Sequence, residues 1–421
     1  MIAAALVPLF VVLTLLRQNV VLTLAVVVGL IHAYVATNSA AKFMIQDLWF
    51  TLDREVLLSI PMFMFAGQIM SRGSIAQRLV RVMTAMTSRL PGGLGVATIL
   101  ALAMFSAISG SGIVTMMAIG GVMYPALIAS GYDKRYALGV LASGGTLGVI
   151  IPPSILMILY GFSTDVSVTD MFRAGWGPGL LMTGLLALYT FILYRNMPTS
   201  RFDVRELWRS LRQGITAMMM PIILLAGIYT GYFTITEAAA LSVFYALVVE
   251  TVIHRELGPR EIYRIGIETI KLLGSLLPLL AFANSFNVIL DYEGVPQALL
   301  GWAQRHIDSA LLLLLAVNVL LLIAGALMDE GSAILILSPL LAPLGAAYGF
   351  DPVHFGIIVI VNLQIGYVMP PVAINVLVAS AVFRESFGTV CRAVMPFIAL
   401  MLLVLVVTIA FPKLSLYFVG R

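Results

Sequence analysis

Two segments of the sequence combine small residues, helix breakers and oxygen-bearing side chains in the same order. The first reads Ser-Ala-Ile-Ser-Gly-Ser-Gly at 106–112 and is followed downstream by Ile151-Pro152-Pro153. The second reads Gly-Ala-Leu-Met-Asp-Glu-Gly-Ser at 325–332 and is followed by Met369-Pro370-Pro371. A double proline removes two backbone donors and unwinds a helix, which leaves carbonyl oxygens without partners. Because hard cations bind oxygen ligands, each segment predicts a cation site.

The two segments are related by a constant offset. Three features of the first half recur 218 residues later in the second half. Pro125 corresponds to Pro343, Gly148 to Gly366, and Pro152-Pro153 to Pro370-Pro371. Glycine and proline fix backbone geometry, so their coincidence at one spacing predicts two copies of one structural unit. A single cluster would indicate a close helix crossing or a kink, whereas matched pairs favour a functional break in each copy.

The composition places this chemistry inside a membrane. Hydrophobic residues make up 61% of the 421 residues and charged residues only 10%, whereas soluble domains carry roughly 25% charged residues. Soluble enzymes, nucleic-acid-binding proteins and disordered chains are therefore excluded. The single cysteine excludes an internal disulfide, and the four scattered histidines argue against a multi-histidine metal site.

Membrane-spanning helices are the elements expected to position the two segments. A span needs about 20 mostly apolar residues, and lipid permits only helices or closed barrels. The first apolar run has no basic residue before Arg17, so we interpret it as structure and not as a signal peptide. Spans or buried apolar segments are predicted at 2–16, 20–36, 55–71, 93–130, 136–160, 174–194, 214–232, 236–253, 266–290, 309–346, 353–380 and 388–411.

Segments 93–130 and 309–346 are too long for one span each. Small residues midway through both predict re-entrant helical hairpins whose tips end within the membrane. The helix after each hairpin is expected to be broken as well, at 143–148 and at 362–366, ahead of the double prolines. Unwound carbonyls beside each hairpin tip predict one cation site per repeat, and the N-termini of the half-helices favour an anionic substrate.

The charges predict how the chain is oriented. Basic residues gather in the connections near 72–89, 195–212 and 255–264, while acids such as Asp165 and Asp291 occupy other connections. The positive-inside rule then places the basic connections in the cytoplasm and both termini outside. An odd number of spans separates the starts of the two units, so the repeats are expected to be inverted, an architecture of secondary transporters.

These predictions divide the chain into five parts. We expect N-terminal scaffold helices at 1–54, a first repeat at 55–170 with hairpin 93–130 and broken helix 136–160, scaffold helices and cytoplasmic connections at 171–264, a second repeat at 265–380 with hairpin 309–346 and broken helix 353–380, and a C-terminal scaffold helix at 381–421.

Asp329 and Glu330 are adjacent acids predicted at membrane depth. Acids in that position are costly and indicate function. Three roles are open for them: a proton carrier, a cation ligand, or a cap at the start of the second hairpin helix. An intramembrane enzyme that uses the two as a carboxylate pair is a further alternative, but it would leave the first hairpin without a purpose.

The sequence resembles the large membrane subunit of a TRAP (tripartite ATP-independent periplasmic) transporter of the DctM type over essentially its whole length. The stretches that carry the resemblance are FSAISGSGIVTMMAIGGVMYPALIASGYDKRYALGVLASGGTLGVIIPPSI, GYFTITEAAALSVFYAL and LMDEGSAILILSPLLAPLGAAYGFDPVHFGIIVIVNLQIGYVMPPVAIN. The resemblance implies an elevator-type transporter similar to the ion transporter superfamily, a separate small four-helix membrane subunit, a periplasmic solute-binding protein, and a bacterial inner-membrane location with no cofactor besides coupling sodium ions.

The resemblance also implies which residues form the sites. The cation ligands would be Ser109, Ser111, Gly145, Gly148 and Ile151 in the first repeat, and Leu327, Asp329, Gly331, Gln364, Gly366 and Met369 in the second. Groups expected to hold the solute are Gly110, Gly112, Ser143, Thr146, Glu330, Ser332 and Asn362. Met369 stands where the family commonly has threonine, and a thioether is a poor ligand for a hard cation, so only its backbone carbonyl is expected to contribute.

Together these observations favour a sodium-coupled importer of a carboxylate, such as a C4-dicarboxylate or sialic acid, and not an enzyme. Two bound cations would offset the charge of an anionic solute, and the loaded domain could then cross the membrane. The alternative within the same fold is a stand-alone ion-coupled carboxylate transporter that works without a binding protein.

Overall fold

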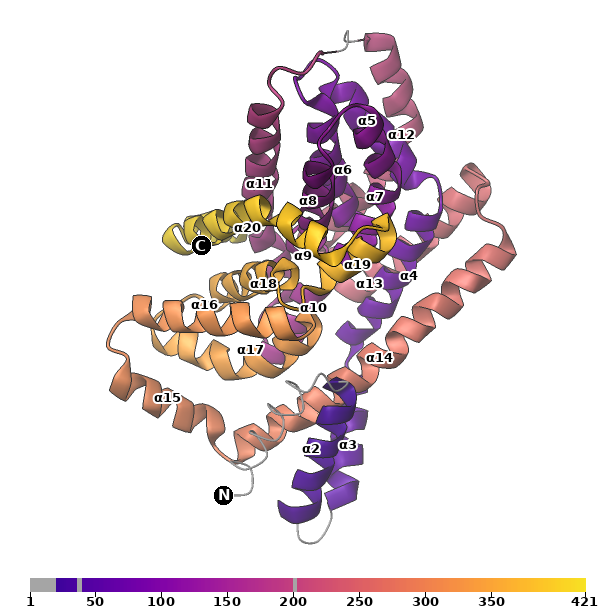
Figure 1. The fold of residues 1–421 in the computed structure, drawn as a ribbon. Coiled ribbons are helices and arrows are strands. Elements are labelled where there is room, and N and C mark those ends of the chain that lie inside the picture. The colour runs from indigo at the N-terminus through magenta and orange to yellow at the C-terminus, as the bar shows by residue number, and fades with distance from the viewer. Residues whose placement is uncertain (1–19, 36–39, 200–202) are drawn as a thin grey trace.

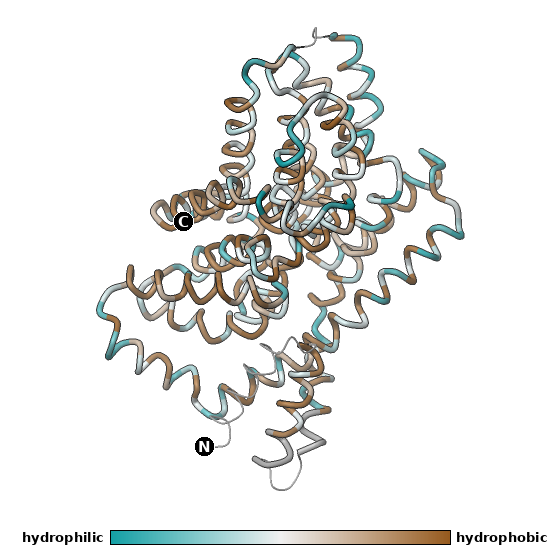
Figure 2. The backbone as a smooth tube through the Cα atoms, viewed as in Figure 1, coloured by the Kyte–Doolittle hydropathy of each residue, from teal (hydrophilic) through white to brown (hydrophobic). Residues whose placement is uncertain are grey.

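The computed structural model describes residues 20–35, 40–199 and 203–421, and every regular element in these ranges is a helix (Figure 1). Eight helices are long and apolar enough to cross a membrane, or up to ten if each of two bent helix pairs forms one span. Figure 2 shows hydrophobic residues along most helices and hydrophilic stretches near the starts of α12 and α14. The prediction of an all-helical polytopic membrane protein is confirmed for the described residues.

The helical elements follow one another in this order: α2 (Val20–Val35), α3 (Ala40–Leu52), η1 (Glu55–Leu58), α4 (Ser59–Arg72), α5 (Ile75–Thr87), α6 (Gly93–Ser109), α7 (Gly112–Ala129), α8 (Lys134–Gly145), α9 (Leu147–Ile150), α10 (Ile155–Thr164), α11 (Val168–Leu193), α12 (Val204–Tyr229), α13 (Ile235–Leu247), η2 (Val248–Ile253), α14 (Pro259–Tyr292), α15 (Val295–His306), α16 (Ala310–Leu327), α17 (Glu330–Ala347), α18 (Pro352–Val368), α19 (Ile374–Phe383), α20 (Phe387–Ala410), α21 (Lys413–Leu416) and η3 (Tyr417–Val419).

The expected span 2–16 lies outside the described residues. Helices α3, α5 and α15 occupy stretches that the apolar pattern does not mark as spans. In α5 the reason is clear, because Ile75, Leu79 and Val82 are buried along one stripe while Arg81 is exposed. A helix with a single apolar stripe has a low average hydropathy, and a search for long apolar runs misses it.

The internal repeat is visible in the helix boundaries. Both ends of α17 lie 218 residues after those of α7, and α18 spans the same interval after the α8–α9 pair. Beyond the double prolines the offset becomes 219, which relates α10 to α19 and the start of α11 to the start of α20. The repeat therefore continues past 170 and 380 into two helices that the sequence had assigned to the scaffold.

Matching turns join the hairpins to the broken helices. Gly131 and Gly349 both have φ +83°, a conformation that glycine adopts without strain. Two residues later, Asp133 and Asp351 each accept hydrogen bonds from two backbone amides at the start of the next helix. Each repeat thus starts its broken helix with the same cap, which fixes how the hairpin leads into it.

Each repeat packs against the hairpin of the other. Helix α10 lies beside α17, and α19 lies beside α7 (Figure 1). In the second of these contacts the rings of Tyr124 and Phe383 are 4.8 Å apart between centroids. Since both contacts begin directly after a double proline, the unwound segments lie between the two hairpins.

Candidate functional site

The first hairpin breaks inside the predicted segment 106–112. Helix α6 ends at Ser109, Gly110 has φ +61°, and α7 begins at Gly112. The Ser109 hydroxyl lies 2.6 Å from the hydroxyl of Thr115 and 3.2 Å from the backbone carbonyl oxygen of Ser111. Because Ser109 is buried, the tip is a compact turn that brings hydroxyl and carbonyl oxygens together.

Glycines let the broken helix reach this tip. A Cβ atom on Gly148 would lie 2.6 Å from the Ser111 carbonyl oxygen, and one on Gly112 would lie 3.3 Å from the Gly145 carbonyl oxygen. After the prolines, the Ile155 amide donates to the Gly110 carbonyl at 3.4 Å. The structure therefore brings Ser109, Ser111, Gly145 and Gly148 together, while Ile151 stands in extended backbone at the end of α9.

At the interruption between α8 and α9, the Ala142 carbonyl oxygen accepts a hydrogen bond from the second repeat. The Thr146 amide bonds to the Ser143 carbonyl at 3.1 Å, and the Thr146 hydroxyl donates to the same oxygen. The Ala142 carbonyl instead accepts a hydrogen bond of 2.6 Å from the side-chain amide of Asn375 in α19. A residue in the second repeat thus caps the break in the first. Asn375 was not singled out from the sequence, although its place just after Pro370-Pro371 is a usable signal.

The second hairpin breaks within 325–332, between the end of α16 at Leu327 and the start of α17 at Glu330. Asp329 accepts hydrogen bonds from the Ser332 amide, at 2.9 Å, and from the Ser332 hydroxyl. Among the three roles left open for the two acids, capping therefore accounts for Asp329. Ser332 is buried as its partner in the cap.

Two glycines bring the second hairpin against α18. A Cβ atom on Gly366 would lie 2.8 Å from the Gly325 Cα, and one on Gly325 would lie 3.0 Å from the Leu363 carbonyl oxygen. Next to this contact the Gln364 side-chain amide donates to the Glu330 carboxylate. The structure therefore joins two predicted site residues from different elements.

The second broken helix is interrupted at its double proline, as expected, but not at 362–366. Helix α18 stays helical to Val368 and ends only at Met369, whose backbone is extended before the prolines. Asn362 does not interrupt the helix, because its side-chain amide donates to Asn318 in α16 at 2.6 Å. Met369 and Leu327 are each more than a third exposed and sit at the margin of the second site. A Cβ atom on Gly331 would lie 3.3 Å from an Asp329 carboxylate oxygen.

Buried oxygen atoms without partners mark both sites. Four fully buried residues of the expected sites and their surroundings have a side-chain oxygen without a hydrogen-bond partner in the described part of the chain: Ser143, Asn362, Gln364 and Asn375. Other buried oxygens without a partner there belong to Thr23, Tyr160, Asn287 and Ser338. Buried polar atoms are satisfied in nearly all proteins, so these oxygens call for a partner that the polypeptide does not supply. Amide and hydroxyl oxygens are suitable ligands for a hard cation.

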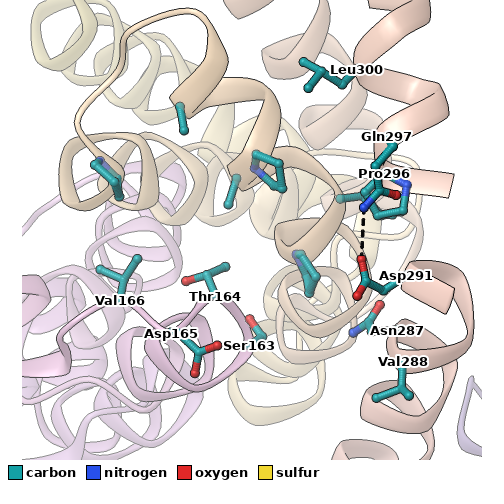
Figure 3. A pocket seen from close by; sticks show the side chains of 16 residues that line it. Ser163, Thr164, Asp165, Val166, Asn287, Val288, Asp291, Pro296, Gln297 and Leu300 are labelled. Atoms are coloured by element: carbon teal, nitrogen blue, oxygen red, sulfur yellow. Dashed lines mark hydrogen bonds between the residues drawn. The ribbon is translucent and has the colours of Figure 1, made fainter. Parts of the chain in front are cut away.

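A cavity of about 700 Å³ lies away from all the expected site residues, between the end of α10, the α14–α15 corner and α17 (Figure 3). Its polar lining includes Ser163, Thr164, Asp165, Asn287 and Asp291, which accepts a hydrogen bond of 3.4 Å from Gln297. Sequence reasoning had used Asp165 and Asp291 only to orient the chain, whereas the structure places both in the lining of this cavity.

The sequence model described as "Tripartite ATP-independent periplasmic transporter, DctM component" matches residues 7–414. The chain belongs to this family. Among its relatives, a "C4-dicarboxylate TRAP transporter large permease protein DctM" from Pseudomonas aeruginosa is 37% identical over 88% of this chain and 87% of the relative. An "Isethionate TRAP transporter permease protein DctMQ" from Oleidesulfovibrio alaskensis is 38% identical over 94% of this chain and 64% of the relative.

A third DctM relative, the "Sialic acid TRAP transporter large permease protein SiaM" of Vibrio cholerae, is 31% identical over 91% of this chain and 90% of its own length. Among solved structures, the Alcanivorax borkumensis YdaH transporter matches 89% of this chain and 87% of its own with a TM-score of 0.61. At 17% identity this match supports only the fold of the chain.

Proposed function

We propose that this DctM-family chain is the large permease subunit of a sodium-coupled importer of an organic acid. The observation that carries the proposal is the set of four buried, unpartnered oxygens beside the hairpins and the broken helices. Ser143 lies just before the interruption between α8 and α9, Gln364 contacts the start of α17, and Asn375 follows the second double proline. Carbonyls freed beside such helix ends are how transporters hold sodium.

The first cation site would form between the tip of the first hairpin and the α8–α9 break. Its ligands would be Ser109, Ser111, Gly145, Gly148 and the Ile151 carbonyl, with Ser143 close by. The second would use Leu327, Gly331, Gln364, Gly366 and the Met369 carbonyl, and Asp329 would hold the tip in place as the cap of α17. Glu330 lies beside this site, because its carboxyl group accepts a hydrogen bond from the Gln364 side-chain amide.

The solute would lie between the two hairpin tips. The groups that would hold it are Gly110, Gly112, Ser143, Thr146, Ser332 and Asn362. The N-terminus of α7 favours an anion, whereas that of α17 is already capped by Asp329. Two bound cations would offset the solute charge and lower the cost of moving it across an apolar barrier. The hairpins and broken helices would then move as one elevator domain against the remaining helices, which would form the scaffold.

The names of the relatives indicate the class of solute. They include a C4-dicarboxylate, isethionate and sialic acid, which are all organic acids. Relatives named for ectoine also exist, so the family accepts zwitterions as well, and an acidic group is the feature these solutes share.

The proposed partners are a small four-helix membrane subunit and a periplasmic solute-binding protein. The DctMQ relative is supporting evidence for the first partner, because this chain covers only 64% of it and a fused small subunit would account for part of the remainder. The assembly would lie in the bacterial inner membrane, with the basic connections in the cytoplasm and both termini in the periplasm.

The test is uptake of candidate carboxylates into proteoliposomes that contain the chain, its small subunit and its binding protein. The proposal predicts uptake that requires an imposed sodium gradient and stops when the binding protein is left out. Uptake driven by a proton gradient alone would contradict sodium coupling, and sodium-driven uptake without the binding protein would favour a stand-alone transporter.

A further inference from the structure

A second cavity, of about 520 Å³, lies between the tip of the first hairpin, the end of α4 and residues 268–272 of α14. Ser109 and Ser111 line it from the hairpin tip, together with apolar residues of α7 and Ile155 of α10. The rest of its wall is formed by α4 and α14, which belong to the proposed scaffold. The cavity is therefore bounded on one side by the first proposed cation site and on the other by helices outside it.

The scaffold wall is polar along one face of each helix. Gln68, Ser71 and Arg72 line the cavity from α4, and Glu268 and Lys271 line it from α14. Residues three and four apart share a helix face, so both sets are continuous stripes. These stripes give the cavity a polar wall that continues to the serines of the hairpin tip.

The charges at the mouth of the cavity are predominantly positive. The two carboxylate oxygens of Glu268 are occupied by Arg72, at 2.5 Å, and by Arg264, at 3.3 Å. Lys271 is exposed and forms no ion pair within the described ranges. The residues that line the cavity include two cations, Arg72 and Lys271, and one carboxylate, Glu268. This leaves an excess of one positive charge, and Lys271 is the cation of the two that has no ion pair in the described ranges.

We propose that Lys271, together with Gln68 and Ser71, binds the acidic group of the solute on its way between the first hairpin tip and the cytoplasm. The inference rests on the proposed import of organic acids, and it adds a site that lies in the scaffold. Arg72 and Glu268 hold α4 and α14 together at the mouth, so the Lys271 ammonium is presented to the cavity by a fixed pair of helices.

Two sources of an anion have to be separated, because a phosphate of an acidic lipid shares this chemistry. The serines of the hairpin tip line the same cavity as Lys271, which favours a solute. In liposomes made only of phosphatidylcholine, no acidic lipid is present that could occupy the site in place of the solute.

The first measurement reports the electrostatic potential in the cavity and needs no transport. Cys391 is the single cysteine, so Gln68→Cys in a Cys391→Ala background introduces one thiol into the wall. The rate of its modification by a sulfonate-bearing methanethiosulfonate is divided by the rate for a trimethylammonium reagent. Removing one charge by Lys271→Gln should lower this ratio about three- to tenfold.

Arg260→Gln is the matched control. It removes the same charge from α14, but it lies about 16 Å along the axis from Lys271, beyond the Debye length of about 8–10 Å in physiological salt. The ratio should therefore change less than twofold in Arg260→Gln. An unchanged ratio in Lys271→Gln would overturn the proposal.

The second measurement is solute exchange as a function of the carboxylate concentration on the cytoplasmic side. Lys271→Gln should raise the half-saturating internal concentration about three- to tenfold and leave the external value, which the binding protein sets, as in the wild type. If Lys271→Gln lowers the ratio of the two modification rates but leaves the half-saturating internal carboxylate concentration unchanged, the proposal that Lys271 binds the solute is overturned. If the wild type carries no carboxylate while the thiol ratio still falls in Lys271→Gln, the proposed function fails and the anion-attracting site stands.

Discussion

The Gln364 side chain donates a hydrogen bond from Nε2 to the Glu330 carboxylate, while its own Oε1 has no partner. The contact joins the start of α17 to the part of α18 that lies just before the second double proline. A cation placed here would meet an amide oxygen and a carboxyl oxygen within one hydrogen-bonded pair. The proposed second cation site would therefore depend on side chains, whereas the proposed first site would use mainly backbone and hydroxyl oxygens.

This difference gives a prediction for the two adjacent acids. Glu330→Gln replaces the carboxyl group that accepts the Gln364 hydrogen bond by an amide and should raise the half-saturating sodium concentration for uptake about tenfold, which corresponds to about 1.4 kcal/mol. Asp329→Asn keeps a side chain that can cap α17 and should change the sodium dependence much less. The measurement is initial uptake against sodium concentration for both variants. A larger effect in Asp329→Asn than in Glu330→Gln would reverse the roles given to these residues.

The close approach at the first hairpin gives a second prediction. An added methyl group in Gly148→Ala would meet the Ser111 carbonyl oxygen at 2.6 Å, so the tip has to move. We expect a loss of about 1–3 kcal/mol of stability and a severe loss of uptake. Gly121→Ala in α7 is the control, because no atom lies within 4 Å of its added carbon. Thermal unfolding and uptake in both variants check this, and normal uptake in Gly148→Ala would show that the tip contact is not needed.

The contact between repeats gives a third prediction. In Asn375→Ala the Ala142 carbonyl loses the donor that lies at 2.6 Å, and a buried acceptor without a partner costs about 1–3 kcal/mol. The melting temperature in detergent should fall accordingly. If it stays at the wild-type value, the hydrogen bond across the repeats does not stabilise the fold.

A fourth prediction concerns pH. Burial raises the pKa of Asp351, but hydrogen bonds from Arg421 and from the amides of His354 and Val353 outweigh it and hold the pKa below the usual value. A lowered folded-state pKa stabilises the protein above the unfolded-state pKa of about 4 and loses this effect as the pH falls through the folded value. Arg421 is half exposed, so Arg421→Gln should cost only about 0.5 kcal/mol at pH 7.

The same substitution should cost progressively less as the pH falls below about 4, where Asp351 becomes protonated in both proteins. Unfolding temperatures of the wild type and Arg421→Gln at a series of pH values measure the difference. A difference that stays constant down to the lowest pH would mean that the interaction with Asp351 does not contribute to it.

Much of the fold could be predicted because glycine and proline determine the backbone wherever they occur. The offset of 218 residues located both hairpins and both double prolines, and helix boundaries follow the same offset. Helices such as α5 were missed because their apolar residues form only one stripe. The second broken helix was expected to be interrupted both at 362–366 and at the double proline, and only the second interruption is present. The polar side chains at 362–366 bond to α16 and to Glu330 and do not disturb the helix.

The site was predictable only in part, because partners across the repeats leave no pattern in the chain. Asn375 and Ala142 are far apart in sequence, and nothing around either residue announces their contact. Lys271 resembles any basic residue at the end of a span until the cavity beside it is seen. Serines and glycines at hairpin tips are recognisable from the sequence, whereas the residues that complete a site from another element are not.

The central claim is that the described oxygens bind sodium, and sodium-dependent unfolding of the purified chain tests it most directly. A ligand that binds only the folded state adds about 2.7 kcal/mol at one hundred times its Kd. The account predicts that sodium chloride raises the melting temperature above its value in choline chloride of equal ionic strength, and that Gln364→Leu reduces this gain. Identical melting temperatures in the two salts at saturating concentrations would contradict it.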